Sequence, residues 1–307
     1  MLLNLKDLNA ASRQRYLQHA VAPRPIAFAS TIGKDGAINL SPFSFFNLFS
    51  TNPPIVIFSP CRRVRDNTVK HTLLNVMEVP EVAINIVDIN MVQQVSLSSC
   101  EYERGVNEFR KAGFTEEASV YIKPPLVKES KVKFECKVLE IKHLGIEGGA
   151  GNLIFCEIIC MHIAEEILDE QGMIDPRKLN QVARLGDNWY AVVTSDNLFE
   201  VEKPNVRLGI GIDALPAFIR NSKILTGNQL GKLANVSVLP EADPAFADEQ
   251  VTTMLMHLAH HNKMNKLETY IGELLNEDKV SDAWQVILLL LKSIEPKTQS
   301  AKPANER

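Results

Sequence analysis

The chain of 307 residues has few cysteines, no excess of basic residues and no long apolar run. Its five cysteines form no C-x-x-C pair, which argues against a disulfide framework and against a zinc site. The formal charge of −4 argues against nucleic acid or an anionic membrane as a partner. No stretch approaches the ~18 apolar residues of a membrane span, and residues 1–20 lack the apolar core of a signal peptide. These absences favour a cytoplasmic protein.

Hydrophobic residues make up 45% of the chain, which is ample for a large core. The composition changes near Pro204, where β-rich sequence gives way to loop-like and then helical sequence. We therefore expect four parts: a β-rich domain over 1–200, a connecting loop with short helical turns over 201–245, a helical region over 246–296 and a disordered tail over 297–307.

The segment 24–60 predicts strands around a polar crossing. Residues 26–31 are β-branched and apolar, and the Gly-Lys-Asp-Gly of 33–36 predicts a tight hairpin turn. Residues 41–47 alternate hydroxyls and an amide with aromatic rings, and 55–58 read as a buried strand. Exposed hydroxyls, free backbone amides and flat apolar surface together suit a planar, hydrogen-bonding ligand, although an ordinary strand crossover would read similarly.

The sequence downstream predicts antiparallel pairing. Strands are expected over 132–143 and 152–163, joined by the Gly-rich turn 145–151 into a long hairpin. A helix opens at Asp175-Pro176 and is expected to end at Arg184-Leu185-Gly186. The few helices are too short to cover a parallel sheet, so a mainly β domain of Greek-key or split-barrel type is favoured over a doubly wound fold.

Several segments resemble the flavin reductase-like family of FMN-binding split β-barrels, in order over about residues 15–195. They are Pro23–Ala27, Asp35-Gly36, Asn39–Asn47, Ser50, Pro53-Pro54, Lys70–Asn75, Val106–Phe109, Gly113–Thr115, Glu135–Lys137, His162-Ile163, Arg184–Gly186 and Tyr190. Two departures fall where the FMN phosphate is expected. His71 stands where the family has Asp, and an additional cationic stretch, 62–67, precedes it.

The resemblance implies an FMN site in the first 200 residues. Residues 41–45 are expected to hold the flavin ring, and the loop after Ser59 to take the phosphate through Arg and Lys side chains and a helix N-terminus. The expected cofactor-binding residues are Thr31, Asn39, Ser41, Pro42, Phe43, Ser44, Phe45, Ser59, Arg65, Lys70, Thr72, Arg184 and Tyr190. The family often carries His near the flavin at the position of His162, which otherwise reads as a hydrogen-bonded barrel residue.

Other motifs are interpreted as structural. The Gly-x-Gly-x-x-Ala of 209–214 has no clear strand before it and no βαβ unit after it, so it is read as a loop. His257, His260 and His261 lack a Cys or carboxylate to complete a metal site, so we expect a solvated helix face and no metal.

The leading hypothesis is an FMN-binding oxidoreductase, a flavin reductase that transfers hydride from NADH or NADPH to flavin N5. Such chemistry needs little acid–base catalysis from side chains. The resemblance further implies a homodimer that passes electrons to a monooxygenase or another acceptor protein. The alternatives are a flavoredoxin-like electron-transfer protein without efficient NAD(P)H turnover, and a barrel tied to a partner by its helical tail.

Overall fold

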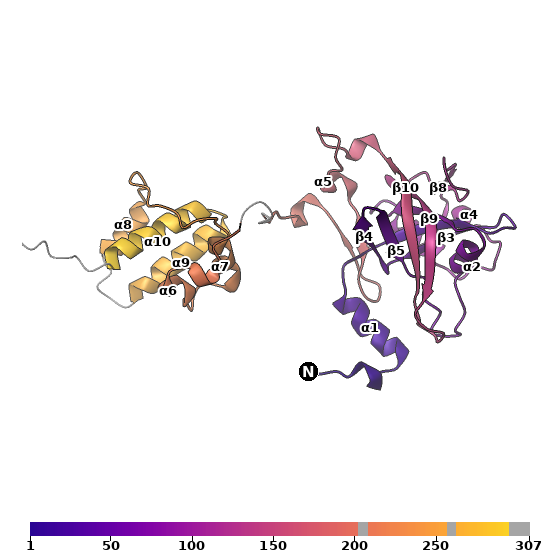
Figure 1. Ribbon diagram of the computed structural model, residues 1–307, viewed down its shortest axis with the longest axis horizontal. Helices are drawn as coiled ribbons and strands as arrows, with labels where there is room; N and C mark the ends of the chain where they lie inside the picture. The colour runs from indigo at the N-terminus through magenta and orange to yellow at the C-terminus, as the bar shows by residue number, and fades with distance from the viewer. Residues whose placement is uncertain (202–207, 257–261, 295–307) are drawn as a thin grey trace, which may run out of the picture. The chain divides into compact units, whose positions relative to one another are not determined.

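The computed structural model describes residues 1–201, 208–256 and 262–294. The chain divides into two compact units, Met1–Phe199 and Glu200–Arg307, each with its own hydrophobic core (Figure 1). Within the described residues, no helix has the length and apolar character needed to cross a membrane. The expected tail over 297–307 and the three histidines at 257, 260 and 261 lie outside the described residues.

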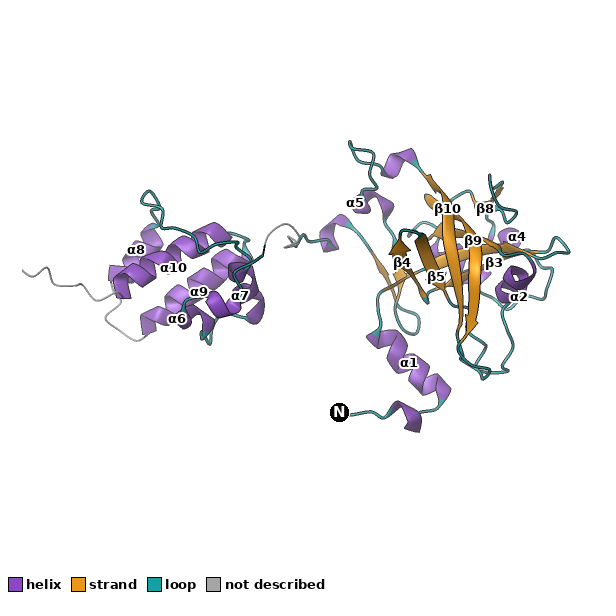
Figure 2. Ribbon diagram, viewed as in Figure 1, coloured by secondary structure: helices purple, strands orange, loops and turns teal. Residues whose placement is uncertain are grey.

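The first unit is mainly β (Figure 2). Its strands are β1 Arg24–Pro25, β2 Ala27–Ile32, β3 Ile38–Phe43, β4 Phe46–Thr51, β5 Pro54–Phe58, β6 Glu81–Ile86, β7 Glu116–Glu117, β8 Leu126–Val127, β9 Val132–His143, β10 Asn152–Ile163, β11 Val182–Arg184 and β12 Tyr190–Val192. Its α-helices are α1 Ala10–Ala20, α2 His71–Glu78, α3 Val92–Ser98, α4 Glu108–Ala112 and α5 Pro176–Leu179.

Seven strands form one antiparallel sheet in the order β3-β2-β6-β9-β10-β5-β4. The turn between β2 and β3 closes with Gly36 at φ +80°, a conformation that glycine adopts without strain. Although β3 and β4 are the two edges of this sheet, only Ser44 and Phe45 separate them in sequence. Two residues cannot cross a flat sheet of seven strands spaced about 4.8 Å apart, so the sheet curls until its edges meet. We call this junction the seam.

Helices cover both faces of the curled sheet. Leu73 and Val76 of α2 pack among the interior side chains of the barrel, including those of Phe58 and Ile84. On the opposite face, α3 and α4 pack against β2 and β3, and Phe109 of α4 is completely buried there. The seam therefore lies between two well-packed cores.

Two local predictions were wrong. Residues 41–47 were expected to cross between strands, but Phe46 already begins β4, an edge strand that pairs with β5. The helix that opens at Pro176 ends at Leu179, where Asn180 turns the backbone to φ +51°. Arg184 consequently lies on strand β11, opposite Arg24, and not at a helix end.

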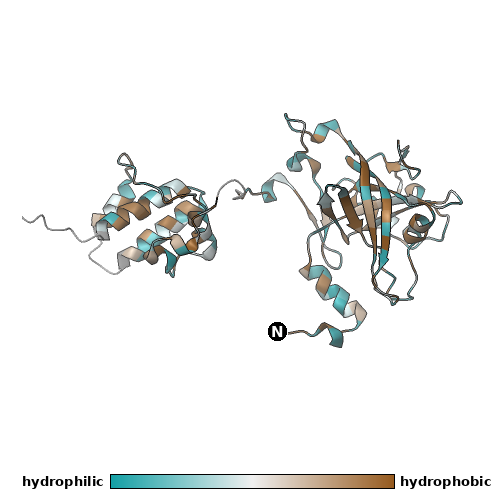
Figure 3. Ribbon diagram, in the orientation of Figure 1, coloured by the Kyte–Doolittle hydropathy of each residue, from teal (hydrophilic) through white to brown (hydrophobic). Residues whose placement is uncertain are grey.

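The second unit is helical, with α6 Ala217–Arg220, α7 Gly227–Ala234, α8 Glu249–Met256, α9 Asn262–Asn276 and α10 Val280–Ile294. Apolar residues dominate α10 (Figure 3), and the indole of its Trp284 donates a hydrogen bond to the carbonyl of Leu233, 3.2 Å away. Leu215, Ile219 and Leu233 are buried in this same core. The segment 201–245, expected as a connecting loop with short helical turns, contains α6 and α7 and, where it is described, packs into the core of the second unit.

Candidate functional site

A cavity of about 560 Å³, here called the seam cavity, lies where the sheet edges meet. One wall is formed by residues 42–45 at the seam, and another by Ser59, residues 61–64 and Lys70. Residues of α1 and the turn 147–150 complete the lining. The structure therefore brings six expected site residues to one cavity. They are Pro42, Phe43, Ser44, Phe45, Ser59 and Lys70.

Neighbouring side chains hold the aromatic wall of the seam cavity in place. The Phe43 ring packs against that of Phe58, with centroids 5.4 Å apart, whereas Phe45 stays 40% exposed. The guanidinium of Arg24 lies 5.8 Å from the centroid of the Phe45 ring. Arg24 is buried and donates hydrogen bonds to the carbonyls of Gln18, Val21 and Leu185. An exposed, supported ring of this kind can stack on a planar ligand.

The opposite end of the seam cavity is cationic. Lys70 immediately precedes α2, and its half-buried ammonium has no carboxylate or hydrogen-bond partner among the described residues. Burial lowers the pKa of Lys70, and the nearby Arg63 lowers it further, while Glu101 opposes this effect. Burial and the cations Arg63, Arg104 and Lys70 likewise lower the pKa of His71. The part of these shifts that comes from the neighbouring cations marks a locally positive region, which favours an anion.

Helix α2 adds partial positive charge to this end. Lys70 provides no side-chain cap, and the first backbone N–H groups of a helix have no intrahelical acceptor. The N–H groups of His71 and Thr72 are therefore suited to an anion, as helix N-termini are in general.

Ser59 lines the seam cavity, and the β9–β10 turn packs closely against its hydroxyl group. Ser59 Oγ accepts a hydrogen bond from the N–H of Asn152 at 3.1 Å, which leaves its own proton to donate. A Cβ on Gly151 would lie 2.8 Å from this oxygen, so a side chain there would displace the hydroxyl. At Gly148, a Cβ would lie 3.0 Å from the carbonyl oxygen of Arg63. Both glycines allow the turn to pack against the cationic loop.

Asn39 and Thr72 lie beside this end in a buried hydrogen-bond network. Thr72 Oγ1 donates to Asn39 Oδ1 at 2.6 Å, and Asn39 Nδ2 donates to Glu108 Oε1 at 2.8 Å. The backbone N–H of Leu40 donates to the second oxygen of Glu108 at 3.0 Å. Together with Ser41, Lys70 and His71, these residues line a small cavity of about 20 Å³. Asn39 and Thr72 thus support the site through their side chains.

Thr31, Arg65 and His162 line neither the seam cavity nor the small cavity beside it. Thr31 is buried and accepts a hydrogen bond from Asn75 at 3.2 Å. Arg65 points to Asp66 and Glu101, and its side chain is 73% exposed, whereas its neighbour Arg63 lines the cavity. His162 lies ten residues along β10 from Asn152, about 30 Å at the rise of a strand. Within one copy of the chain, His162 is therefore remote from Ser59.

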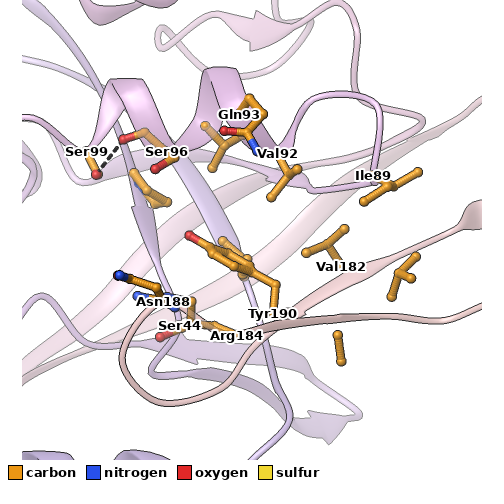
Figure 4. Close-up of a pocket in the computed structure, with 15 residues that line it drawn as sticks. Ser44, Ile89, Val92, Gln93, Ser96, Ser99, Val182, Arg184, Asn188 and Tyr190 are labelled. Carbon is orange, nitrogen blue, oxygen red and sulfur yellow. Dashed lines mark hydrogen bonds between the residues drawn. The ribbon is translucent and has the colours of Figure 1, made fainter.

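A second cavity, of about 730 Å³, lies between α3 and the β11–β12 hairpin and is called the hairpin cavity. Figure 4 shows Gln93 and Ser96 of α3 on one side and Arg184 and Tyr190 on the other. The guanidinium of Arg184 lies 4.5 Å from the centroid of the Tyr190 ring. Among the described residues that line it, Arg184 alone is charged. Pro42 and Ser44 line both cavities, so the seam separates them.

Residues 19–183 match the family described as "Flavin reductase like domain". The chain belongs to this family. An uncharacterized protein of Aquifex aeolicus is 36% identical over 186 residues, which cover 61% of this chain and 92% of that protein. The prediction of the family from the sequence is thus confirmed.

Solved structures of the same kind confirm the split-barrel fold. Component B of nitrilotriacetate monooxygenase from Bacillus cereus matches with TM-score 0.61 and 27% identity, covering 66% of this chain and 98% of that one. A putative flavin reductase with a split barrel domain from Shewanella frigidimarina matches with TM-score 0.56 and 25% identity, covering 66% and 99%. The matched share of this chain corresponds in size to its first unit, so a helical unit is added to the family domain.

The sequence alone did not reveal the roles of Arg24, Arg63 and the glycines of the β9–β10 turn. Arg24 stood within a family segment, but its support of Phe45 depends on carbonyls from distant parts of the chain. The path of the backbone decides which side chains of the cationic loop 62–67 face the cavity. The Gly-rich turn was recognised as a turn, and its approach to Ser59 required the three-dimensional register.

Proposed function

We propose that the chain binds FMN in the seam cavity, with the flavin ring at residues 42–45 and the phosphate at Lys70. The observation that carries this proposal is the half-buried ammonium of Lys70 at the start of α2, which has no partner among the described residues and lines a cavity that also has an aromatic wall. The donor set fits the cofactor because a phosphate dianion takes charge-assisted hydrogen bonds and a ring takes a flat apolar wall.

The residues divide the work of holding the cofactor. Lys70, Ser59 and the N–H groups of His71 and Thr72 hold the phosphate, while Arg63 adds charge. The backbone and hydroxyl of Ser44 orient the polar edge of the ring, and Phe45 covers its face. The bound flavin supplies hydride acceptance and donation, so these side chains need only position it and exclude water.

Titration of the purified, flavin-free chain with FMN tests the binding. We expect a saturable change in the flavin absorption and fluorescence with one FMN per chain, and much weaker binding of riboflavin, which lacks the phosphate. A chain that gains no flavin band with either compound would remove the central claim.

We further propose that the chain is a flavin reductase that accepts hydride from NADH or NADPH. The hairpin cavity supports this, because it shares Pro42 and Ser44 with the seam cavity and offers Arg184 to an anionic donor. In stopped-flow mixing, one of the two nucleotides is expected to bleach the absorption band of the bound flavin. The bleaching should be complete within the dead time of the instrument or follow a single kinetic phase. If dithionite bleaches the flavin and neither nucleotide does, the chain is an electron-transfer protein of flavoredoxin type.

FMN affinity is expected to fall as the pH rises toward 10.5. The Lys70 ammonium must be charged to bind a dianion, and its pKa is lowered below the ordinary 10.5 before the phosphate arrives. Affinity therefore declines as the pH rises through that lowered pKa, and it declines again on the acid side as the phosphate protonates near pH ~6. Fluorescence titrations at a series of pH values measure both limbs.

Riboflavin is the control for this pH profile, since it shares every titration of the ring and lacks the phosphate. Lys70→Arg should move the alkaline limb to higher pH, because a guanidinium stays charged there. An identical alkaline limb for FMN and riboflavin would contradict the role of Lys70.

A homodimer that passes electrons to a monooxygenase or a comparable acceptor is also proposed. The edge strand β4 exposes Leu48 (54%) and Phe49 (64%), as a surface for a second copy would. The likeness to a monooxygenase component B supports an acceptor of that class. Light scattering at micromolar concentration tests the dimer, which a strictly monomeric mass would exclude.

A further inference from the structure

Strand β10 carries a bulge that arranges three side chains remote from the seam cavity. The register between β9 and β10 shifts between Ile158 and Cys160, so Ile159 is an additional residue. The shift places Cys160 directly opposite Glu135 of β9. His162 follows two residues later and therefore points to the same face as Cys160. Bulges of this kind commonly re-aim side chains at functional sites.

The three side chains present a sulfur, a nitrogen and an oxygen to one point. One ligand atom from each of Glu135, Cys160 and His162 lies within 4.8 Å of the others. His162 Nε2 is 2.7 Å from Glu135 Oε1 and 3.8 Å from Cys160 Sγ. In a tetrahedral zinc site, bond lengths of about 2.0 to 2.3 Å separate such atoms by about 3.3 to 3.6 Å. Small side-chain shifts would bring all three to that separation.

Glu135 is prepared as a charged ligand. Its side chain is completely buried, yet its oxygens accept hydrogen bonds from the backbone N–H groups of Val120, Tyr121 and Ile122. Hydrogen bonds behind a ligand fix its position, which is the usual arrangement around bound metals.

The surroundings suit a divalent cation with one open position. The His162 side chain is 27% exposed and Cys160 is half-buried, so water can reach the cluster from one side. Lys133, opposite His162 on β9, is paired with Glu117 and adds no net charge. A buried carboxylate, a thiolate and a neutral imidazole would balance a dication, and zinc accepts this mixture of ligands.

We propose that Glu135, Cys160 and His162 bind a zinc ion, with water as the fourth ligand. The ion would tie β9, β10 and the loop over 118–124 together at the end of the barrel away from Ser59. Within one copy of the chain this site is remote from Ser59, so its test does not depend on the proposed flavin site. The alternative is a hydrogen bond between His162 and Glu135 without a metal ion, and that arrangement does not require Cys160.

Calorimetric titration of the chelator-treated full chain, without an affinity tag, with ZnCl₂ tests the proposal. We expect one zinc per chain, a higher melting temperature with zinc, and a thiolate-to-metal absorption band in the near ultraviolet when Co²⁺ replaces zinc. Cys160→Ser and His162→Gln should each weaken zinc binding at least ~100-fold, more than the loss of an outer-shell partner does. Cys100→Ser, which removes an exposed thiol, should bind zinc as the native chain does.

The Cys160→Ser variant should retain its circular dichroism spectrum and FMN affinity, which shows that lost zinc binding is not lost folding. The proposal is overturned if the native chain shows no cobalt–thiolate absorption band when Co²⁺ is added. So does zinc binding that survives both Cys160→Ser and His162→Gln, because the ion would then be held elsewhere.

Discussion

Replacing Lys70 with alanine is expected to weaken FMN binding by roughly 10- to 150-fold. A hydrogen bond to a charged group is worth about 1.5–3 kcal/mol, and each 1.4 kcal/mol corresponds to about tenfold in affinity. Lys70 should reach this range because its ammonium is half-buried and has no competing carboxylate partner among the described residues. Fluorescence titration of the flavin-free variant gives the dissociation constant. Riboflavin affinity should change by less than about twofold, since its ring contacts are preserved.

Arg65→Ala is the matched control for Lys70→Ala. Arg65 lies in the same loop and carries the same charge, but it is exposed and engaged with Asp66 and Glu101. We expect its FMN affinity to stay within about twofold of the native value, as is common for exposed charge pairs. Equal losses in the two variants would mean that overall loop charge, and not the position of Lys70, holds the phosphate.

Replacing Glu108 with alanine is expected to lower the free energy of unfolding of the first unit by about 3 kcal/mol. Glu108 is 3% exposed and accepts hydrogen bonds from Asn39 and from the backbone of Leu40. Alanine leaves both donors buried without an acceptor, at a cost of about 1–3 kcal/mol each. Urea unfolding followed by circular dichroism measures the change, and the loosened Asn39 and Thr72 should also weaken FMN binding.

Glu108→Gln should cost much less, about 1 kcal/mol. The Gln oxygen can accept from Leu40, and its amide can donate to Asn39 once the Asn39 amide flips and donates to the Thr72 hydroxyl. Every buried donor except the Thr72 hydroxyl then keeps an acceptor, and the loss of that one bond accounts for the smaller cost. Equal destabilisation by alanine and glutamine would show that the charge of Glu108, and not its acceptor geometry, stabilises the network.

The long hairpin was predictable from the sequence, whereas the edge strand was not. The predicted bounds of β9 and β10 agree with the structure because apolar positions recur along both strands and a Gly-rich turn joins them. Strand β4 exposes Leu48 and Phe49, so its apolar residues follow no burial pattern that a sequence would show. An edge strand obtains its identity from its neighbour, which here is β5.

The sequence indicated which residue types form the candidate site, but not which side chains face the cavity. Lys70 was expected from a family segment and Ser59 from its place at a strand end beside the cationic loop, and both line the seam cavity. Arg65 was expected at the phosphate on charge and position, yet its side chain is exposed beside Asp66 and Glu101, whereas Arg63 lines the cavity. Glu135 of β9 lies 25 residues before Cys160 of β10, so no sequence spacing could indicate that it meets Cys160 and His162.

The seam gives the barrel a closure made by the covalent chain. Most barrels close by pairing their first and last strands through hydrogen bonds, but here β3 runs into β4 through Ser44 and Phe45 alone. A ligand seated at that junction can leave without breaking any pairing between strands. For the flavin proposed to bind there, exchange would be uncoupled from unfolding, and its release would depend on side-chain and phosphate contacts on the timescale of local motion.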